Sequence, residues 1–313
     1  MSTPDSPPET FSFVVIPDTQ VLARDHPDVL LTMARWIREH TRELSLRAVV
    51  HLGDIVDHGA RDELQFRRSL EAFAVLESAG MPLLLAAGNH DYDDPITSKR
   101  GPVPEERSRD LVMFNQYFGQ HRLDDQPWFG GTFEPQGAEN MYAVLGTTRE
   151  SFLFVVLEFA PRPAVMAWAD DVIRAHPRCK VVVITHSYMF LNGERVNATH
   201  PANPKRKYPA AATGRDGEDM WTDHLSHHPN LLAVFAGHHI PGGAGHRVDL
   251  GVHGNAVYQF FQNWQDFELG GGGRFRIVTY DETGPTLRIR VVNPTTGRYE
   301  SEPGYELTAL DVG

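Results

Sequence analysis

Five short apolar runs, spread over the first 240 residues of the chain, each lead into side chains that can bind a metal ion. The runs and the polar residues after them are 11–17 with Asp18, 47–52 with Asp54 and Asp57, 82–87 with Asn89, His90 and Asp91, 180–185 with His186, and 231–236 with His238. Apolar runs of this length, bounded by glycine and polar residues, are typical of buried strands. Because open α/β folds bind ligands at the carboxyl ends of their strands, the sequence predicts one site assembled from five strand ends.

The residue types at these strand ends point to a pair of metal ions. Aspartate oxygens, the Asn89 carbonyl and neutral imidazoles form a mixed set that suits Mn, Fe or Zn, whereas an all-oxygen set would favour Mg or Ca. Asp54 follows a glycine, which lets backbone pass close by, so we expect its carboxylate to bridge the two ions. Two ions about 3.5–4 Å apart generate a hydroxide nucleophile and hold phosphoryl oxygens. The pattern therefore favours an enzyme acting on phosphate esters.

In order and spacing, these motifs resemble those of the calcineurin-like metallophosphoesterases. They are Asp18-x-Gln20, Gly53-Asp54-x-x-Asp57, Gly88-Asn89-His90-Asp91, a lone His186 and Gly237-His238, over residues 11 to about 240. The resemblance implies an α/β fold, a four-layer αββα sandwich of two mixed β-sheets flanked by helices, with two divalent or trivalent metal ions at one sheet edge. It also implies that one metal takes Asp54, Asn89, His186 and His238, and that the other takes Asp18, Gln20 and Asp54.

Two positions depart from the family pattern, and both weaken the second metal site. The family's first-motif histidine is Gln20 here, which offers only a neutral amide oxygen, and its closing histidine falls on Ile240, which cannot bind a metal. His239 and His253 are the candidates to complete the site. Because neighbouring residues in a strand point to opposite faces, we expect His239 to face away, and we predict that His253 lines the site.

The resemblance places His90 beside the substrate, where it would protonate the leaving alkoxide as general acid. Its orienting partner is predicted to be Asp57 or Asp91. Asn89 is expected to contact phosphoryl oxygens as well as a metal. Weaker predictions assign oxygen-binding roles to Asn140 and Arg195. In this mechanism a hydroxide held between the metals attacks phosphorus in line, and no phosphoenzyme forms.

A long segment at 188–214 directly follows His186 and is predicted to be an insertion that sets substrate specificity, because binding residues are disproportionately on loops. It carries the basic triplet Lys205-Arg206-Lys207. The triplet either holds a remote phosphate or is solvated surface, and solvation is the favoured interpretation.

Composition limits the partners of this 313-residue chain. A net charge of −12 disfavours nucleic acid, because polyphosphate binding depends on Lys and Arg neutralising the backbone. No apolar stretch approaches the about 18–20 residues needed to cross a membrane. The single Cys179 excludes an internal disulfide and fits a reducing compartment, so we predict a cytoplasmic location. A small-molecule phosphoester is the expected substrate.

Periodicity predicts the remaining organisation. We expect helices at 28–42, 62–79, 107–118 and 164–175, an antiparallel strand pair at 140–145 and 151–157, and strands at 256–261, 274–280 and 286–292. The last three are expected in a second sheet, with a hairpin at Gly270–Gly273. Residues 1–10 are predicted to be a flexible tail and residues 11–313 one domain, because a boundary between 18 and 238 would divide the site.

Two alternative functions stay open at this stage. In the first, Gln20 and Ile240 mark a degenerate site, and the protein is a binding scaffold without turnover. In the second, the protein is a nuclease-type phosphodiesterase, which would need an open basic groove.

Overall fold

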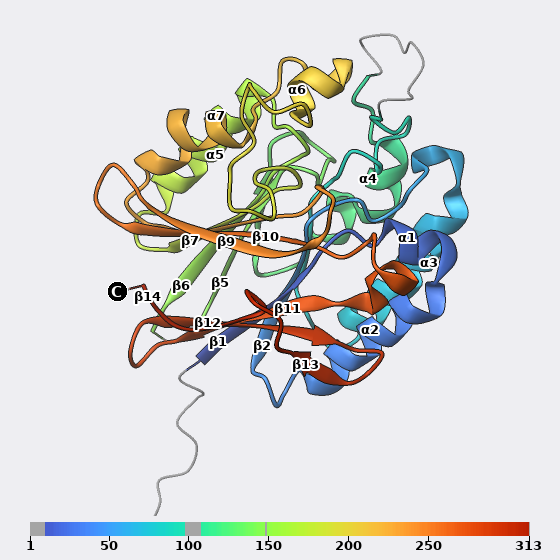
Figure 1. Ribbon diagram of the computed structural model, residues 1–313, viewed down its shortest axis with the longest axis horizontal. Coiled ribbons are helices and arrows are strands. Elements are labelled where there is room, and N and C mark those ends of the chain that lie inside the picture. The colour runs from blue at the N-terminus through green and yellow to red at the C-terminus, as the bar shows by residue number, and fades with distance from the viewer. Residues whose placement is uncertain (1–9, 98–107, 148, 313) are drawn as a thin grey trace, which may run out of the picture.

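Two seven-stranded β-sheets lie face to face in the computed structural model, with helices against their outer faces (Figure 1). The structure describes residues 10–97, 108–147 and 149–312. The predicted tail at 1–10 therefore lies outside the described residues, apart from Thr10, which begins the first strand. The predicted αββα architecture is confirmed.

The first sheet has the order β13-β12-β11-β1-β2-β3, and β14 pairs with β12. Its strands are β1 (Thr10–Ile16), β2 (Leu46–His51), β3 (Leu83–Leu85), β11 (Phe275–Asp281), β12 (Thr286–Asn293), β13 (Arg298–Glu300) and β14 (Glu306–Asp311). β1, β2 and β3 run parallel to one another, whereas β11 pairs antiparallel with β1. The three parallel strands therefore deliver their carboxyl ends to a single edge.

Helices cover the outer face of this first sheet. They are α1 (Gln20–Asp25), α2 (Pro27–His40) and α3 (Glu63–Glu77), with α4 (Val112–Phe118) beside α3. Met33 and Ile37 of α2 and Phe73 of α3 are fully buried in the outer core. The apolar stripes predicted at 28–42 and 62–79 are the faces that these helices bury.

The second sheet has the order β4-β5-β6-β7-β8-β10-β9. Its strands are β4 (Phe129–Thr132), β5 (Met141–Gly146), β6 (Ser151–Val156), β7 (Lys180–Ile184), β8 (Leu231–Ala236), β9 (Gly243–Leu250) and β10 (Ala256–Asn263). β6, β7, β8 and β10 are parallel. Helix α5 (Pro163–Ala175) and α7 (Gly217–Asp223) lie on its outer side, with α6 (Pro204–Lys207) above the site end of the sheets (Figure 1).

Aromatic side chains fill the space between the sheets. Phe11 of β1 stacks on Phe152 of β6 with ring centroids 4.2 Å apart, and Phe13 meets Phe154 and Phe235 edge-on at 5.2 and 5.8 Å. Val14, the next residue along β1, faces the outer core instead. β1 is thus buried on both faces, which explains why its residues 13–16 form a continuous apolar run and not an alternating one.

The predicted placement of the last strands is partly wrong. β10 joins the second sheet, but β11 and β12 return to the first, where β11 pairs with β1. Gly270–Gly273 is therefore no hairpin: it belongs to the 3-10 segment Glu268–Gly273 that carries the chain from one sheet to the other, with positive φ at all four glycines. Among the described residues, no helix has the length and apolar character to cross a membrane.

Candidate metal centre

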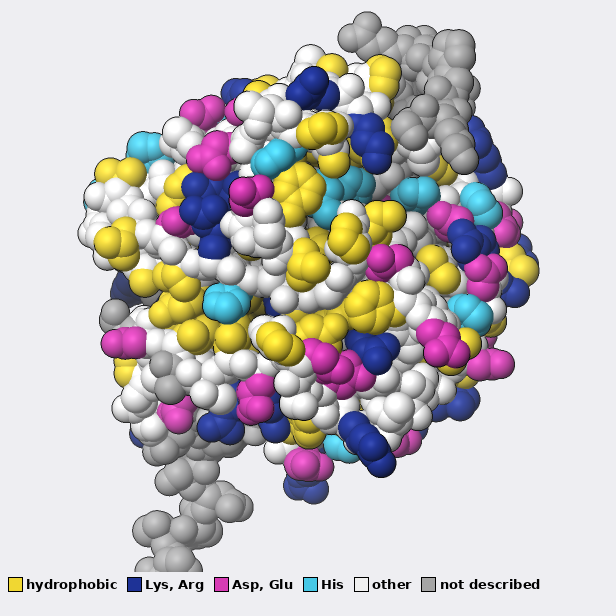
Figure 2. Space-filling model, in the orientation of Figure 1, with side chains coloured by type: hydrophobic (Ala, Val, Ile, Leu, Met, Phe, Trp, Pro, Cys, Tyr) yellow, Lys and Arg dark blue, Asp and Glu magenta, His cyan; other side chains and the backbone are white. Residues whose placement is uncertain are grey.

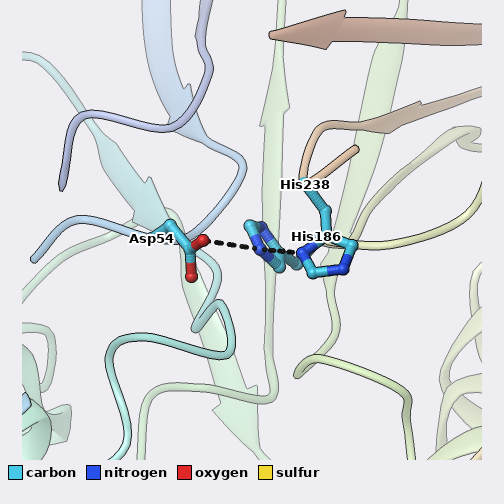
Figure 3. Close-up of side chains that lie close together, drawn as sticks. All are labelled: Asp54, His186 and His238. Atoms are coloured by element: carbon cyan, nitrogen blue, oxygen red, sulfur yellow. Dashed lines mark hydrogen bonds and ion pairs between the residues drawn. The ribbon is translucent and has the colours of Figure 1, made fainter. Parts of the chain in front are cut away.

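Asp54, Asn89, His186 and His238 meet where the parallel strands of both sheets end. The Nε2 atom of His186 lies 3.2 Å from an oxygen of Asp54, 3.2 Å from Oδ1 of Asn89 and 3.1 Å from Nδ1 of His238. Ligand atoms of Asp54, His186 and His238 all lie within 4.8 Å of one another. Figure 3 shows these three side chains pointing toward a common space between the strand ends. The structure therefore brings together the four residues predicted for one metal position.

The backbone fixes the ring orientation of His186. Its Nδ1 lies 2.8 Å from the carbonyl oxygen of Leu52, so Nδ1 carries the proton and donates to that carbonyl. Nε2 is then the ring atom directed at Asp54 and Asn89, and it would bind a metal ion in place of its proton. A histidine held by a backbone carbonyl in this way is the usual arrangement of a metal ligand.

Glycines allow the site loops to approach closely. A Cβ on Gly88 would lie 2.2 Å from the backbone nitrogen and from Oδ1 of Asp54, and a Cβ on Gly237 would lie 2.4 Å from Oδ1 of Asp18. Asp54 and His238 themselves adopt positive φ angles of 53° and 72°. Backbone strain of this kind costs about 1–3 kcal/mol and is concentrated at functional sites.

Two buried carboxylates place negative charge at this edge of the sheets, which a cation would neutralise. Asp18 and Asp54 are almost completely buried. Burial raises the pKa of Asp18 to about 7. Burial also opposes charge on His186, but Asp54 and Asp18 outweigh it and raise the pKa of the imidazole to about 9. Buried carboxylates that raise the pKa of a neighbouring buried histidine concentrate negative charge, as expected at a site that binds a metal ion.

Asp18 lies beside this cluster and is held by two amides that the sequence prediction missed. Nδ2 of Asn263 donates to Oδ2 of Asp18 at 3.0 Å, and Nε2 of Gln265 donates to the same oxygen at 3.1 Å. Gln20 in turn donates to Oε1 of Gln265 at 2.5 Å, and its own buried Oε1 has no hydrogen-bond partner among the described residues. Gln20 thus lies at the site as predicted.

A signal for Asn263 and Gln265 was present in the sequence. They terminate and follow the apolar run 256–261, which is the same strand-end pattern that identified the other five segments. β10 runs parallel to β8, so its carboxyl end lies at the same edge as His238. The run was not linked to the site because its sheet and direction depend on pairing with distant strands.

His90 and Asp57 form a second group beside the metal cluster. Nδ1 of His90 lies 2.8 Å from the carbonyl oxygen and 3.1 Å from a carboxylate oxygen of Asp57. Asp57 is also bonded to Arg24. Burial lowers the pKa of His90, but Asp54 and Asp57 prevail and raise it to about 9. Of the two predicted orienting partners, Asp57 contacts His90.

Asp91 has a different surrounding. It is fully buried, and its two oxygens accept hydrogen bonds from the backbone nitrogens of Val56 and Gly88 at 3.0 and 2.8 Å. The carboxylate therefore joins the loops after β2 and β3, and it does not reach His90 in the described hydrogen-bond network.

Three further predicted site residues lie elsewhere. His253 contacts the carbonyl oxygen of His227 at 3.2 Å, at the amino ends of β8 and β10, which is the opposite edge of the sheet. Asn140 pairs with buried Glu158, donating at 3.1 Å and accepting at 2.9 Å. Arg195 is buried in ion pairs with Glu218 and Asp249. The placement of these residues in the pocket is wrong, because strand direction and ion pairing are set by long-range contacts.

A cavity of about 330 Å³ opens over the metal cluster. Its lining includes Gln20, Asp54, Asn89, His90, Lys207, Tyr208, His238, His239, Ile240 and Gln265. Lys207 and Tyr208 come from the 188–214 segment. His239 was expected to face away, but it lines this cavity and contacts Ser187 Oγ at 3.1 Å. A larger cavity of about 730 Å³, lined by Arg109, Glu139 and others, contains none of the metal-cluster residues.

A comparison with models of known protein families identifies the family of this chain. The sequence model described as calcineurin-like phosphoesterase matches residues 11–249. The chain belongs to this family. The family is one of phosphoric ester hydrolases and is dimetal-dependent.

Relatives of this calcineurin-like phosphoesterase are distant. The uncharacterized protein YvnB of Bacillus subtilis is 24% identical over 292 residues, which are 91% of this chain and 20% of YvnB. The chain thus spans about a fifth of the length of that relative. A dimetal phosphatase from Danio rerio is 16% identical, with a TM-score of 0.52 over 96% of this chain and 98% of that one. GAP50 of Plasmodium, described as the anchor in the inner membrane complex, is 9% identical with a TM-score of 0.51 over 97% and 89% of the two chains. The structural likenesses support the fold.

Proposed function

We propose that this protein hydrolyses a small-molecule phosphoester at the edge where Asp54, Asn89, His186 and His238 converge. The observation that carries the proposal is the opening of this cluster into a cavity of about 330 Å³, with His90 on its wall. That volume lies at the lower end of small-molecule sites. A polymer would need an extended groove instead.

The residues divide into metal-binding and substrate-binding groups. Asp54, Asn89, His186 and His238 would hold one ion, and Asp18, Gln20 and Asp54 the other. Bound ions would supply an activated water and charge neutralisation for the phosphoryl group. The mixed nitrogen and oxygen donors of the first set fit Mn, Fe or Zn.

His90 would supply the proton for the leaving oxygen. Its Nδ1 is directed at Asp57 and its side chain lines the cavity, so Nε2 is the atom placed to serve the substrate. Asp57 keeps the ring turned and favours its charged form. Asp91, by joining two loops, would act on the geometry of the site and not on the substrate.

Lys207 and Tyr208 replace Asn140 and Arg195 as the proposed substrate contacts. In the basic triplet, Lys205 is paired with Asp216 at 2.9 Å and also with Asp219, and Arg206 donates to the carbonyls of Ala198 and Thr199. Lys207 instead lies 5.1 Å from the centre of the Tyr208 ring and lines the cavity. Lys207 would bind oxygens of the substrate outside the reacting phosphate. Residues 188–214 are therefore the proposed specificity segment, within one proposed domain that spans residues 11–313.

The charge distribution gives no support to the nuclease alternative. On the one face of the molecule that Figure 2 draws, the Lys and Arg side chains of the described residues are interspersed with Asp and Glu and form no continuous basic stripe. Contacts of Lys and Arg with the phosphate backbone dominate nucleic-acid affinity.

The cytoplasmic location of this protein stays a prediction.

The test is metal-dependent hydrolysis. Protein stripped with a chelator and refilled with Mn²⁺ should cleave p-nitrophenyl phosphate or its bis ester, and Asp54→Ala should lose the activity. Asp171→Ala, which changes an exposed aspartate of α5, is the matched control and should behave as wild type. Refilled wild type that binds metal but cleaves neither ester would favour the scaffold alternative.

A further inference from the structure

The two metal positions are built from different chemistry. The first takes two imidazoles, His186 and His238, with Asp54 and Asn89. Around Asp18 the neighbouring side chains are amides: Asn263 and Gln265 donate to its carboxylate, and Gln20 is bonded to Gln265. Ile240, where the family pattern has a histidine, is 64% exposed and offers no ligand.

Gln265 lies where it can fill that position. It lines the same cavity as Asp54 and Gln20. Its amide lies between both residues of the first motif, 3.1 Å from Asp18 Oδ2 and 2.5 Å from Gln20 Nε2. Its backbone nitrogen donates to Oδ1 of Asn263 at 3.0 Å, which fixes the turn after β10. The side chain is therefore held at the site from both ends.

An unsatisfied oxygen indicates what these amides are arranged to bind. Gln20 is 7% exposed, and no group in the described part of the chain forms a hydrogen bond with its buried Oε1. Buried carbonyl oxygens are rarely left so, because each costs about 1–3 kcal/mol. Gln265 Oε1 accepts a hydrogen bond from Gln20 Nε2, and an amide oxygen has two lone pairs, so the second can bind a cation. A cation beside Asp18 would satisfy Gln20 Oε1 and bind the second lone pair of Gln265 Oε1.

We propose that Gln265 supplies the ligand missing at Ile240, and that the position around Asp18 is an oxygen-only site for a hard divalent cation such as Mg²⁺ or Mn²⁺. Its ligands are carboxylate oxygens of Asp18 and Asp54 and amide oxygens of Gln20 and Gln265. Carboxylate and carbonyl oxygens suit Mg and Mn, whereas imidazoles suit Zn and Fe. The centre is thus designed for two unlike metals. The inference rests on the proposed function for its catalytic meaning but not for its test.

Metal binding to chelator-stripped protein tests the inference without substrate. Metal content by mass spectrometry and titration calorimetry with Zn²⁺ and Mn²⁺ should show one position that prefers Zn²⁺ and a second that takes Mn²⁺. Gln265→Leu should weaken Mn²⁺ binding at the second position roughly 10–100-fold, on the scale of lost metal-site groups, and leave Zn²⁺ at the first. Gln126→Leu, at an exposed position, is the matched control and should bind both metals as wild type does.

Gln265→His separates a ligand from a structural role. An imidazole at this position should shift the second site's preference from Mn²⁺ toward Zn²⁺, a change that a merely structural glutamine would not produce. It also keeps the inference testable if Gln265→Leu unfolds. Unchanged Mn²⁺ affinity in a folded Gln265→Leu, or no change of preference in Gln265→His, would overturn the inference. Two bound metals without ester hydrolysis would overturn the proposed function alone.

Discussion

Backbone groups hold several of the proposed ligand side chains in place. His186 is fixed by the carbonyl of Leu52, and Asp18 accepts a hydrogen bond from the backbone nitrogen of His238. The motif residues Asp54, Asn89 and His186 could be predicted because short motifs carry such local geometry with them. His253, Arg195 and Gln265 could not be placed correctly, because their positions depend on partners far away in the sequence.

His90 is predicted to matter most for esters with poor leaving groups. His90→Gln removes the proton donor, so kcat for an alkyl phosphate should fall by about 10²–10⁴-fold. Hydrolysis of p-nitrophenyl esters should fall much less, because p-nitrophenolate leaves without a proton. Steady-state kinetics with both ester classes measures the difference. An equal loss for both would count against a general-acid role.

Lys207 is predicted to act on binding and not on bond cleavage. Lys207→Ala should raise KM by about tenfold or more for a substrate with a second anionic group, as a charge-assisted hydrogen bond contributes about 1.5–3 kcal/mol. kcat should change little. Arg206→Ala is the control, since that guanidinium binds backbone carbonyls. Equal KM values for Lys207→Ala and Arg206→Ala would mean that Lys207 does not bind the substrate.

At the scale of elements, the site is a property of strand ends and of the loops that follow them. The sequence predicted α2, α3 and α5 well because amphipathic periodicity is local. It placed β11 and β12 in the wrong sheet because sheet membership is decided by pairing, and β11 pairs with β1 across almost the whole chain. This error did not affect the prediction of the site, because the five motif segments all precede β9.

Gly88→Ala should disrupt the loop after β3 and, with it, the metal position. The added Cβ would lie 2.2 Å from the Asp54 backbone nitrogen and Oδ1, so the Asp54 loop must shift. We expect the free energy of unfolding to fall by about 1–3 kcal/mol and metal affinity to fall with it. Gly284→Ala, whose Cβ would meet no described atom within 4 Å, should change neither. Urea unfolding and metal titration of both variants measure this, and wild-type metal affinity in Gly88→Ala would contradict the packing argument.

At the scale of the whole molecule, polar links hold the outer helices on the second sheet. Asp170 of α5 bonds to His224 at 2.7 Å and to His228 at 2.8 Å, and these histidines lie between α7 and β8. Burial opposes charge on Asp170, but the hydrogen bonds from the histidines prevail and lower its pKa to about 2. The link therefore makes the stability of the protein depend on pH.

The sign of that dependence follows from the lowered pKa. The pKa of Asp170 is about 2 in the folded protein, below the ordinary 3.8, so the ionised carboxylate stabilises the fold. This stabilisation is fully present above about pH 4 and is lost as the pH falls toward 2. Asp170→Asn should lower the free energy of unfolding at pH 6 by about 1–2 kcal/mol, and the difference from wild type should shrink below pH 4. Urea unfolding of chelator-treated protein across pH 3–6 checks this. A difference that stays constant with pH would mean that the carboxylate charge is not involved.

The pairing of β1 with β11 also has a consequence for how the chain is made. Ser12 and Thr279, which are bonded through their hydroxyls, are 267 residues apart in the sequence. During synthesis β1 can pair with β2 early, but its other edge stays open until residues 275–281 have left the ribosome. An unpaired apolar strand is a template for aggregation, and long-range pairing of this kind forms slowly. The nascent chain is therefore expected to depend on chaperones that shield this edge until the last strands arrive.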